Sequence, residues 1–159
     1  MRGKKTPPTT RHANILSTLK SQLSPASQPS TFNPQLLPRM FNFEKLDTWQ
    51  KAIAFADDVY RITRAFPGDE RFGLTNQMRR AAVSISSNIA EGTSRSSHVD
   101  YARFVEIATG SVFEVVSQSF VSRNQRFLAP DDFQKLYTGA EELSRMFSGL
   151  RGYLLRDES

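Results

Sequence analysis

The segment Leu74–Gly92, LTNQMRRAAVSISSNIAEG, constrains the fold more than any other part of the sequence. Its apolar and small side chains recur every three or four residues, so they line one stripe of an α-helix. Gly92 follows the stripe, and a glycine at the C′ position commonly ends a helix. Alanine and serine side chains let a neighbouring backbone approach closely, so we expect a tight seam between helices. The stripe consists of Leu74, Met78, Ala81, Ala82, Ile85 and Ile89.

Three other segments show the same helical spacing. The second helix, described above, runs from about Leu74 to Glu91, and the first covers Leu46–Phe66. The expected buried stripe of the first helix consists of Leu46, Trp49, Ile53, Ala56, Val59, Tyr60 and Phe66. A hydroxyl-rich linker, Thr93–Ser97, precedes the third helix, which ends near Gln125, and the fourth begins at Pro130. No segment favours a strand over a helix. Four amphipathic helices with short connections predict an all-α, up-down-up-down four-helix bundle.

Two residues inside these helices carry more specific expectations. Thr75 is a plausible capping residue for the second helix, because threonine side chains accept hydrogen bonds from free amides at helix starts. Gly110 lies in the middle of the third helix, where glycine costs about 1 kcal/mol relative to alanine. Such a cost suggests that another backbone approaches Gly110 closely.

The inventory of residues excludes several classes of site. The 159 residues suffice for one domain with a core, and they include no cysteine. His12 and His98 are the two histidines, so one subunit has too few for a histidine zinc site or a Ser-His-Asp triad. We therefore expect no metal, no cofactor and no catalytic residues. Uninterrupted apolar runs such as Ala52–Ala56 are far shorter than a membrane span, which predicts no membrane association.

The net charge of +5 is unevenly distributed. The first 39 residues carry six Lys or Arg and no acid, so residues 40–159 carry −1. These first residues also hold six prolines among many Ser, Thr, Asn and Gln, a composition typical of disorder. We therefore predict a disordered basic leader over 1–39 and a four-helix bundle domain over 40–159.

Three interpretations of the leader remain open. Signals of order begin abruptly at Met40, which favours a start codon placed too far upstream. The basic, serine-rich, acid-free composition also resembles a transit peptide. The third interpretation is a tail without function.

The quoted segments lead to a family. FEKLDTWQKA, VYRITRAFPGDERFGLTNQMRRAAVSISSNIAEG and FVEIATGSVFEV resemble, in order and spacing, the four-helix bundle proteins also called 23S rRNA intervening-sequence proteins. The resemblance covers Phe43 to about Leu155. It implies a bacterial, cytoplasmic four-helix bundle that assembles into a homopentamer and whose biochemical role is poorly established. A group with a similar fold, the accessory proteins of diversity-generating retroelements, engages nucleic acid and a reverse transcriptase.

Two sets of polar residues are candidate sites. Guanidinium groups bind phosphate bidentately, and repetition in an oligomer multiplies a weak patch, so a ring of arginines is a candidate RNA-binding surface. In the alternative, Arg80 pairs with acids such as Glu91, Glu106 or Glu114, either within the bundle or across subunits. A second set forms a polar lane between the second and third helices, which predicts a structural network more than a catalytic site. The arginines are Arg79, Arg80, Arg95, Arg103, Arg123 and Arg126, and the lane comprises Ser84, Asn88, Glu91, Glu106, Gly110, Ser111 and Glu114.

Three functions compete at this point. The first is a non-enzymatic homo-oligomeric scaffold that binds RNA or a protein that handles nucleic acid. The second is a protein-binding module, such as an accessory subunit of a reverse transcriptase. The third, a small hydrolase or transferase that uses the acidic residues of the lane, has the least support.

Overall fold

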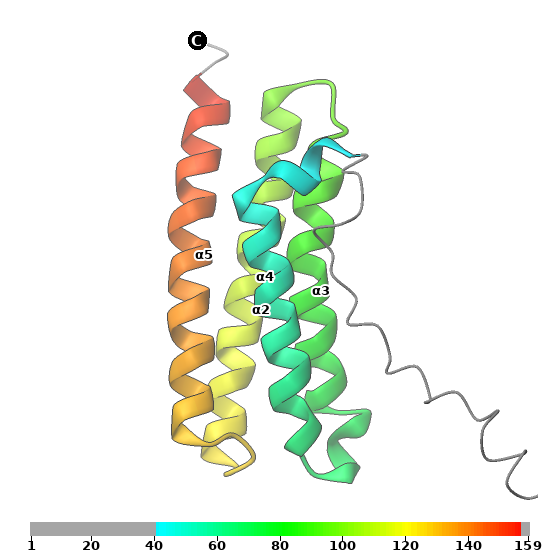
Figure 1. The fold of residues 1–159 in the computed structure, drawn as a ribbon, viewed down its shortest axis with the longest axis vertical. Coiled ribbons are helices and arrows are strands. Elements are labelled where there is room, and N and C mark those ends of the chain that lie inside the picture. Colours follow the sequence, from blue (N-terminus) through cyan, green and yellow to red (C-terminus); the bar gives the residue numbers. More distant parts are fainter. Residues whose placement is uncertain (1–40, 157–159) are drawn as a thin grey trace, which may run out of the picture. The chain divides into compact units, whose positions relative to one another are not determined.

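A computed structural model describes residues 41–156, and within that range it is a bundle of four long helices (Figure 1). The helices alternate in direction along the chain, and the described residues contain no strand. The predicted all-α, up-down-up-down bundle is confirmed. The leader predicted over 1–39 lies outside the described residues. The long helices are α2 (Asp47–Ile62), α3 (Leu74–Gly92), α4 (His98–Asn124) and α5 (Pro130–Arg156), and the short 3-10 segments are η2 (Asn42–Lys45), η3 (Thr63–Ala65) and η4 (Gly68–Arg71).

The four helices follow one another around the bundle. α3 packs most extensively against α4, and α4 against α5, while α2 closes the ring by contacting α3 and α5. α3 and α5 are therefore on opposite sides of the bundle (Figure 1). Because α5 does not adjoin α3, a substitution on α5 leaves the surface of α3 unchanged and can serve as a control for a substitution there.

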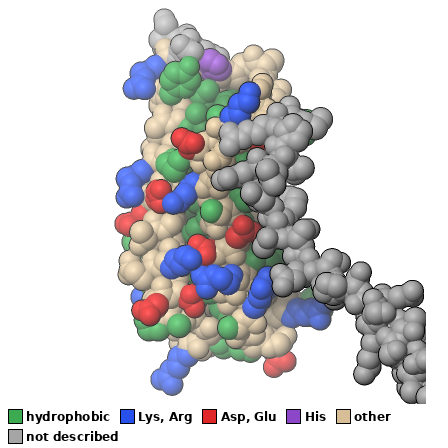
Figure 2. Space-filling view, in the orientation of Figure 1, with side chains coloured by type: hydrophobic (Ala, Val, Ile, Leu, Met, Phe, Trp, Pro, Cys, Tyr) green, Lys and Arg blue, Asp and Glu red, His purple; other side chains and the backbone are tan. Residues whose placement is uncertain are grey.

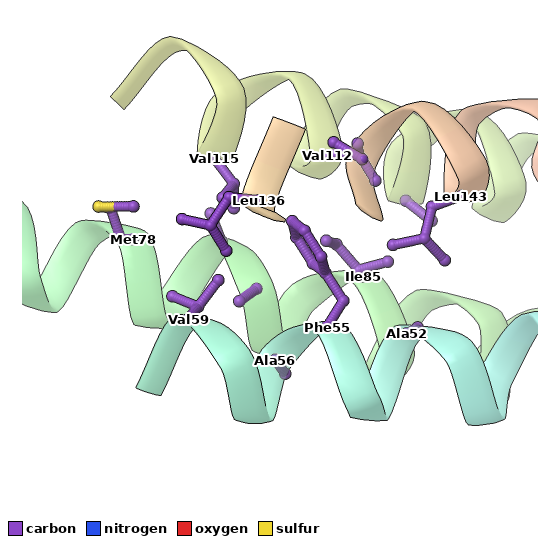
Figure 3. Packing of buried hydrophobic residues seen from close by; sticks show 14 of the residues in the cluster. Ala52, Phe55, Ala56, Val59, Met78, Ile85, Val112, Val115, Leu136 and Leu143 are labelled. Carbon is purple, nitrogen blue, oxygen red and sulfur yellow. The ribbon is translucent and has the colours of Figure 1, made fainter. Parts of the chain in front are cut away.

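One hydrophobic core runs along the bundle axis, with contributions from all four helices (Figure 3). α2 supplies Phe55 and Val59, which face Ile85 of α3, Val115 of α4 and Leu136 of α5. The predicted stripe on α3 is buried except for Leu74, which is half-buried. Burial of a side chain the size of Leu or Phe contributes about 1.5–3 kcal/mol, so this core stabilises the fold.

The seam between α3 and α4 is as close as the small residues predict. Ser84 of α3 and Ser111 of α4 lie with their hydroxyl oxygens 3.0 Å apart. Deeper in the seam, the Ser122 hydroxyl donates to the backbone carbonyl of Gln118 and lies 3.6 Å from the Met78 sulfur. Bonds back to the helix's own carbonyls satisfy the buried hydroxyls, so small polar residues are tolerated in this contact.

The helical spacing predicted the wrong burial for two residues of α2. Ile53 and Tyr60 were expected in the buried stripe, but both are exposed, and Phe55 and Ile62 are buried instead. The true stripe is rotated around the helix relative to the expected one, because successive residues turn by about 100° and stripe borders are ambiguous. Tyr60 is therefore available on the surface beside α3.

α3 ends at Gly92 as predicted, but the predicted mechanisms at both ends of this helix were wrong. Gly92 is the last residue of α3 and has no positive φ, so it is not a left-handed C′ glycine. A Cβ built on Gly92 would overlap the Tyr101 ring, so the close approach of this side chain requires glycine. Thr75 is buried within α3 and does not cap it, because the Glu70 carboxylate accepts from the Leu74 amide at 2.9 Å.

α4 carries apolar residues on its outer face as well as in the core. Ile107 is 52% exposed and Phe113 is 60% exposed, and Val121 continues the same side of the helix. Gly110 lies between them, and no other element among residues 41–156 comes within 4 Å of a Cβ built on it, so the close backbone approach expected there does not occur within the described part of the chain. By length and composition α4 is apolar enough to cross a membrane, although it packs in the bundle between α3 and α5.

The α2 side of the bundle carries interspersed positive and negative side chains (Figure 2). Lys51 and Glu142 form an ion pair of 2.5 Å between α2 and α5, and Asp58 and Lys135 form another of 2.6 Å. Exposed ion pairs contribute little stability individually, about 0–1 kcal/mol each. Their main effect here is that most charges between α2 and α5 are already paired.

Candidate nucleic-acid interface

A recess of about 500 Å³ lies between Tyr60 of α2 and the first half of α3. It contains two cations, an amide and hydroxyl groups, and no acidic residue among 41–156 lines it. α3 builds most of this wall because its residues recur on the outer face at helical spacing. The lining residues are Tyr60, Asn76, Arg79, Arg80, Val83, Ser84 and Ser87.

The guanidinium of Arg79 is held in place on two sides. Its Nε donates to the Thr63 hydroxyl oxygen at 2.9 Å, and its Cζ lies 4.8 Å from the centroid of the Tyr60 ring. Thr63 is itself buried and donates its hydroxyl proton to the Val59 carbonyl at 2.8 Å. The side chain of Arg79 is therefore preorganised, which reduces the entropy lost when it binds an anion.

Neither Arg79 nor Arg80 forms an ion pair with any residue between 41 and 156. Arg80 therefore does not pair with an acid of its own bundle, and pairing across subunits stays a prediction. Glu91 pairs with Arg95 one turn later on the same surface, and Glu106 accepts from Arg151 of α5 at 2.6 Å. A cation without a partnered acid keeps its charge available for a ligand.

The third acid named in that alternative, Glu114, lies on the outer face of α4. Its Oε1 accepts from the Gln118 side-chain amide at 3.0 Å. The side-chain carbonyl oxygen of Gln118, Oε1, is buried without a hydrogen-bond partner among the described residues. Glu114 therefore belongs to a pair within α4 and does not reach the recess.

None of the remaining candidate arginines lines the recess with Arg79 and Arg80. Arg95, which pairs with Glu91, and Arg103, which pairs with Asp100, lie near the opposite end of the bundle. Arg123 and Arg126 follow each other at the end of α4. Arg123 stacks on Phe120 and Phe133 with Cζ 4.9 and 4.2 Å from the ring centroids, so its charge lies over an aromatic surface at the α4–α5 corner.

The predicted polar lane divides into a connected part and separate pairs. Ser84, Asn88 and Ser111 are connected, because the Asn88 amide donates to the Ser84 hydroxyl at 3.0 Å and Ser111 lies within hydrogen-bonding distance of the same oxygen. The three acids of the lane point elsewhere, as described above, and Gly110 is exposed. The lane therefore does not bring two carboxylates together.

The chemistry available in the recess is anion binding. It combines the two unpaired guanidinium groups with hydroxyl and amide donors, which together match the oxygens of a phosphate ester. Among residues 41–156 no group of three or more His, Asp or Glu could hold a metal ion. Tyr60 and Thr63 hold the guanidinium of Arg79, although no sequence pattern marked either of them as a site residue. The 16-residue separation between Thr63 and Arg79 hides their contact from any local pattern.

Comparison with known proteins identifies the family. The family model described as 23S rRNA-intervening sequence protein matches residues 44–149. The chain belongs to this family. The match begins just before α2 and ends within α5, so it contains the recess and the complete seam between α3 and α4.

A solved structure has the same fold. It is a protein of unknown function from the S23 ribosomal protein family of Bacteroides thetaiotaomicron, with 17% sequence identity and a TM-score of 0.59. The similarity covers 65% of this chain and 97% of that one. No curated protein matches the chain. Neither the family description nor that of the solved structure names an enzymatic activity.

Proposed function

We propose that this protein is a non-enzymatic, homo-oligomeric scaffold that binds RNA through the recess between Tyr60 and α3. The observation that carries the proposal is the pair of unpaired guanidinium groups, Arg79 and Arg80, in a recess without acids. Guanidinium groups recognise phosphate by charge and by bidentate hydrogen bonds.

Self-assembly is the second part of the proposal, and the family resemblance implies a pentamer. The outer face of α4 supports self-assembly, because an apolar face with Phe113 at 60% exposure is unfavourable in water. Repetition of the recess in each subunit would convert weak phosphate contacts into multivalent binding. This multiplication compensates for the near-neutral charge of the bundle domain.

The same apolar face supports a second candidate function. A face bearing Ile107 and Phe113 suits a protein partner, so α4 could hold a single polypeptide such as a reverse transcriptase. In that case RNA binding would be incidental. Recovery of the same partner after nuclease treatment, with unchanged yield, would favour this second function.

A charge-matched comparison of variants tests the RNA-binding proposal. The Arg79→Ala, Arg80→Ala variant of the full chain removes two cations from the recess. Arg145→Ala, Arg156→Ala removes two from the exposed surface of α5 and leaves α3 unchanged. We expect the first variant to bind RNA about tenfold more weakly than the second in fluorescence anisotropy at low salt, and to show a shallower salt dependence.

The comparison cancels the contribution of the basic leader, because both variants retain it. Circular dichroism and the elution volume of each variant report whether fold and assembly are preserved. Equal RNA affinity for the two double variants would contradict the proposal, and so would the absence of RNA binding by the wild-type protein at low salt.

A further inference from the structure

We infer that the recess takes an unpaired nucleotide, so that the RNA bound by this protein is single-stranded. This inference rests on the proposed function and deepens it, because it specifies which form of RNA the site accepts. The shape of the recess, its stacking surfaces and the small extent of its positive charge support it independently.

The shape favours an unpaired nucleotide. The recess is open to solvent on one side and has a volume of about 500 Å³, within the usual range for small-molecule sites and large enough for one nucleotide. A duplex keeps its bases inside and presents convex sugar-phosphate strands to a protein. Duplex RNA is therefore recognised across broad surfaces, whereas unpaired bases enter pockets.

The recess also offers planar surfaces for stacking. Tyr60 is 40% exposed, and Arg79 lies over its ring with the guanidinium held by Thr63. Unpaired bases stack on aromatic rings and on guanidinium planes. The geometry places a base against the Tyr60–Arg79 pair, where Arg80 and Ser87 lie close enough to line the same recess and donate to its phosphate.

The distribution of charge disfavours a duplex. Residues 41–156 contain nearly equal numbers of acids and bases, and Asp57 is exposed one turn before Tyr60 on α2. A duplex carries two rows of phosphates, so tight binding requires positive charge over a wide surface. The two cations of the recess are sufficient for one backbone segment.

The test compares matched probes and variants of the full chain. A labelled, unstructured RNA of about twelve nucleotides and the corresponding duplex are titrated in fluorescence anisotropy at low salt. We expect the wild-type protein to prefer the single strand, and Tyr60→Ala to weaken single-strand binding about tenfold while duplex binding barely changes. Tyr60→Phe, which keeps the ring, should bind like the wild type. Tyr153→Ala, which removes an exposed tyrosine from α5, serves as the matched control.

A second variant keeps Tyr60 and all charges. Thr63→Val is nearly isosteric and removes the acceptor that holds Arg79 Nε, so we expect a smaller loss of single-strand binding in the same direction. If Tyr60→Ala lowers the helical content of the protein, Thr63→Val still tests the inference.

The two proposals fail in different ways. Equal affinity for duplex and single strand, or unchanged binding by both Tyr60→Ala and Thr63→Val, would overturn the inference. The proposed function would survive that result if Arg79→Ala, Arg80→Ala still bound RNA more weakly than its charge-matched control. Loss of that difference would overturn both.

Discussion

At the scale of single residues, the side chain of Tyr101 determines which residue can stand at the position of Gly92. The Tyr101 ring covers Gly92 at the end of α3, where any Cβ would overlap it. The Tyr101 hydroxyl is buried without a hydrogen-bond partner among the described residues. Because burial disfavours the charged phenolate, it raises the pKa of Tyr101 above the ordinary range of a tyrosine.

This raised pKa predicts a stability difference at high pH. The folded protein retains the Tyr101 proton to higher pH than the unfolded chain, so the associated stability is complete below about pH 10 and is lost as pH rises through the folded pKa. Tyr101→Phe keeps the ring over Gly92 and removes the titration. We expect its unfolding temperature to fall less than that of the wild type above about pH 10.

Thermal unfolding followed by circular dichroism from about pH 8 to 11 measures the difference. Near pH 8 the Phe variant should be as stable as the wild type or slightly more stable, because it lacks a buried hydroxyl without a partner. Parallel decreases for both proteins across the whole range would contradict the assigned environment of Tyr101.

At the scale of an element, the end of α4 contains an unusual residue. Arg126 has a φ of 61°, the left-handed region that favours glycine. The Phe127 amide donates to the Ser122 carbonyl at 2.9 Å and the Arg126 amide to the Arg123 carbonyl at 3.0 Å, which together form a Schellman motif. An arginine therefore occupies the C′ position where helices usually place glycine.

Two variants of this residue separate backbone strain from charge. Arg126→Gly relieves the strain, whereas Arg126→Ala removes the same charge and retains a Cβ in the left-handed region. We expect the Gly variant to be about 1 kcal/mol more stable than the Ala variant in urea unfolding, because left-handed backbone costs an L-residue about that much. Equal stability of the two variants would show that the end of α4 adopts another conformation in solution.

At the scale of the whole molecule, α4 differs from the other long helices because it carries more exposed large apolar side chains than any of them, Ile107 and Phe113 among these. If α4 packs against a second copy, a charge in the middle of its outer face should prevent assembly. Phe113→Glu places a carboxylate there, and Tyr153→Glu places one on α5 at a position of similar exposure, 56% against 60%.

Light scattering after size exclusion measures the mass of each full-length variant. We expect the wild type and Tyr153→Glu to have a mass several times the 18.0 kDa of one chain, and Phe113→Glu to approach a single chain. A wild-type protein of one chain mass would refute self-assembly. Dissociation of both variants would mean that the contact is not specific to α4.

The sequence identified part of the candidate site and missed the rest. Arg79 and Arg80 were recognised because adjacent arginines stand out in a helix of small residues. Tyr60 was wrongly assigned to the core, and nothing local linked Thr63 to Arg79. Sequence order also grouped Arg95 with Arg79, although α3 and α4 place Arg95 and Arg103 far from the recess. Contacts between helices depend on rotation and register, which spacing within one helix does not specify.

The sequence by itself determined the helices, because their spacing, the proline at the start of α5 and the polar linker after α3 act within a few residues. It also indicated that α3 packs closely against a neighbouring helix, since small side chains set the distance between backbones, and the structure identifies that neighbour as α4. Only the tertiary structure decided which charges are paired and which face the recess. Ion pairs such as Glu106 with Arg151 join residues 45 positions apart, and packing of all four helices brings them together.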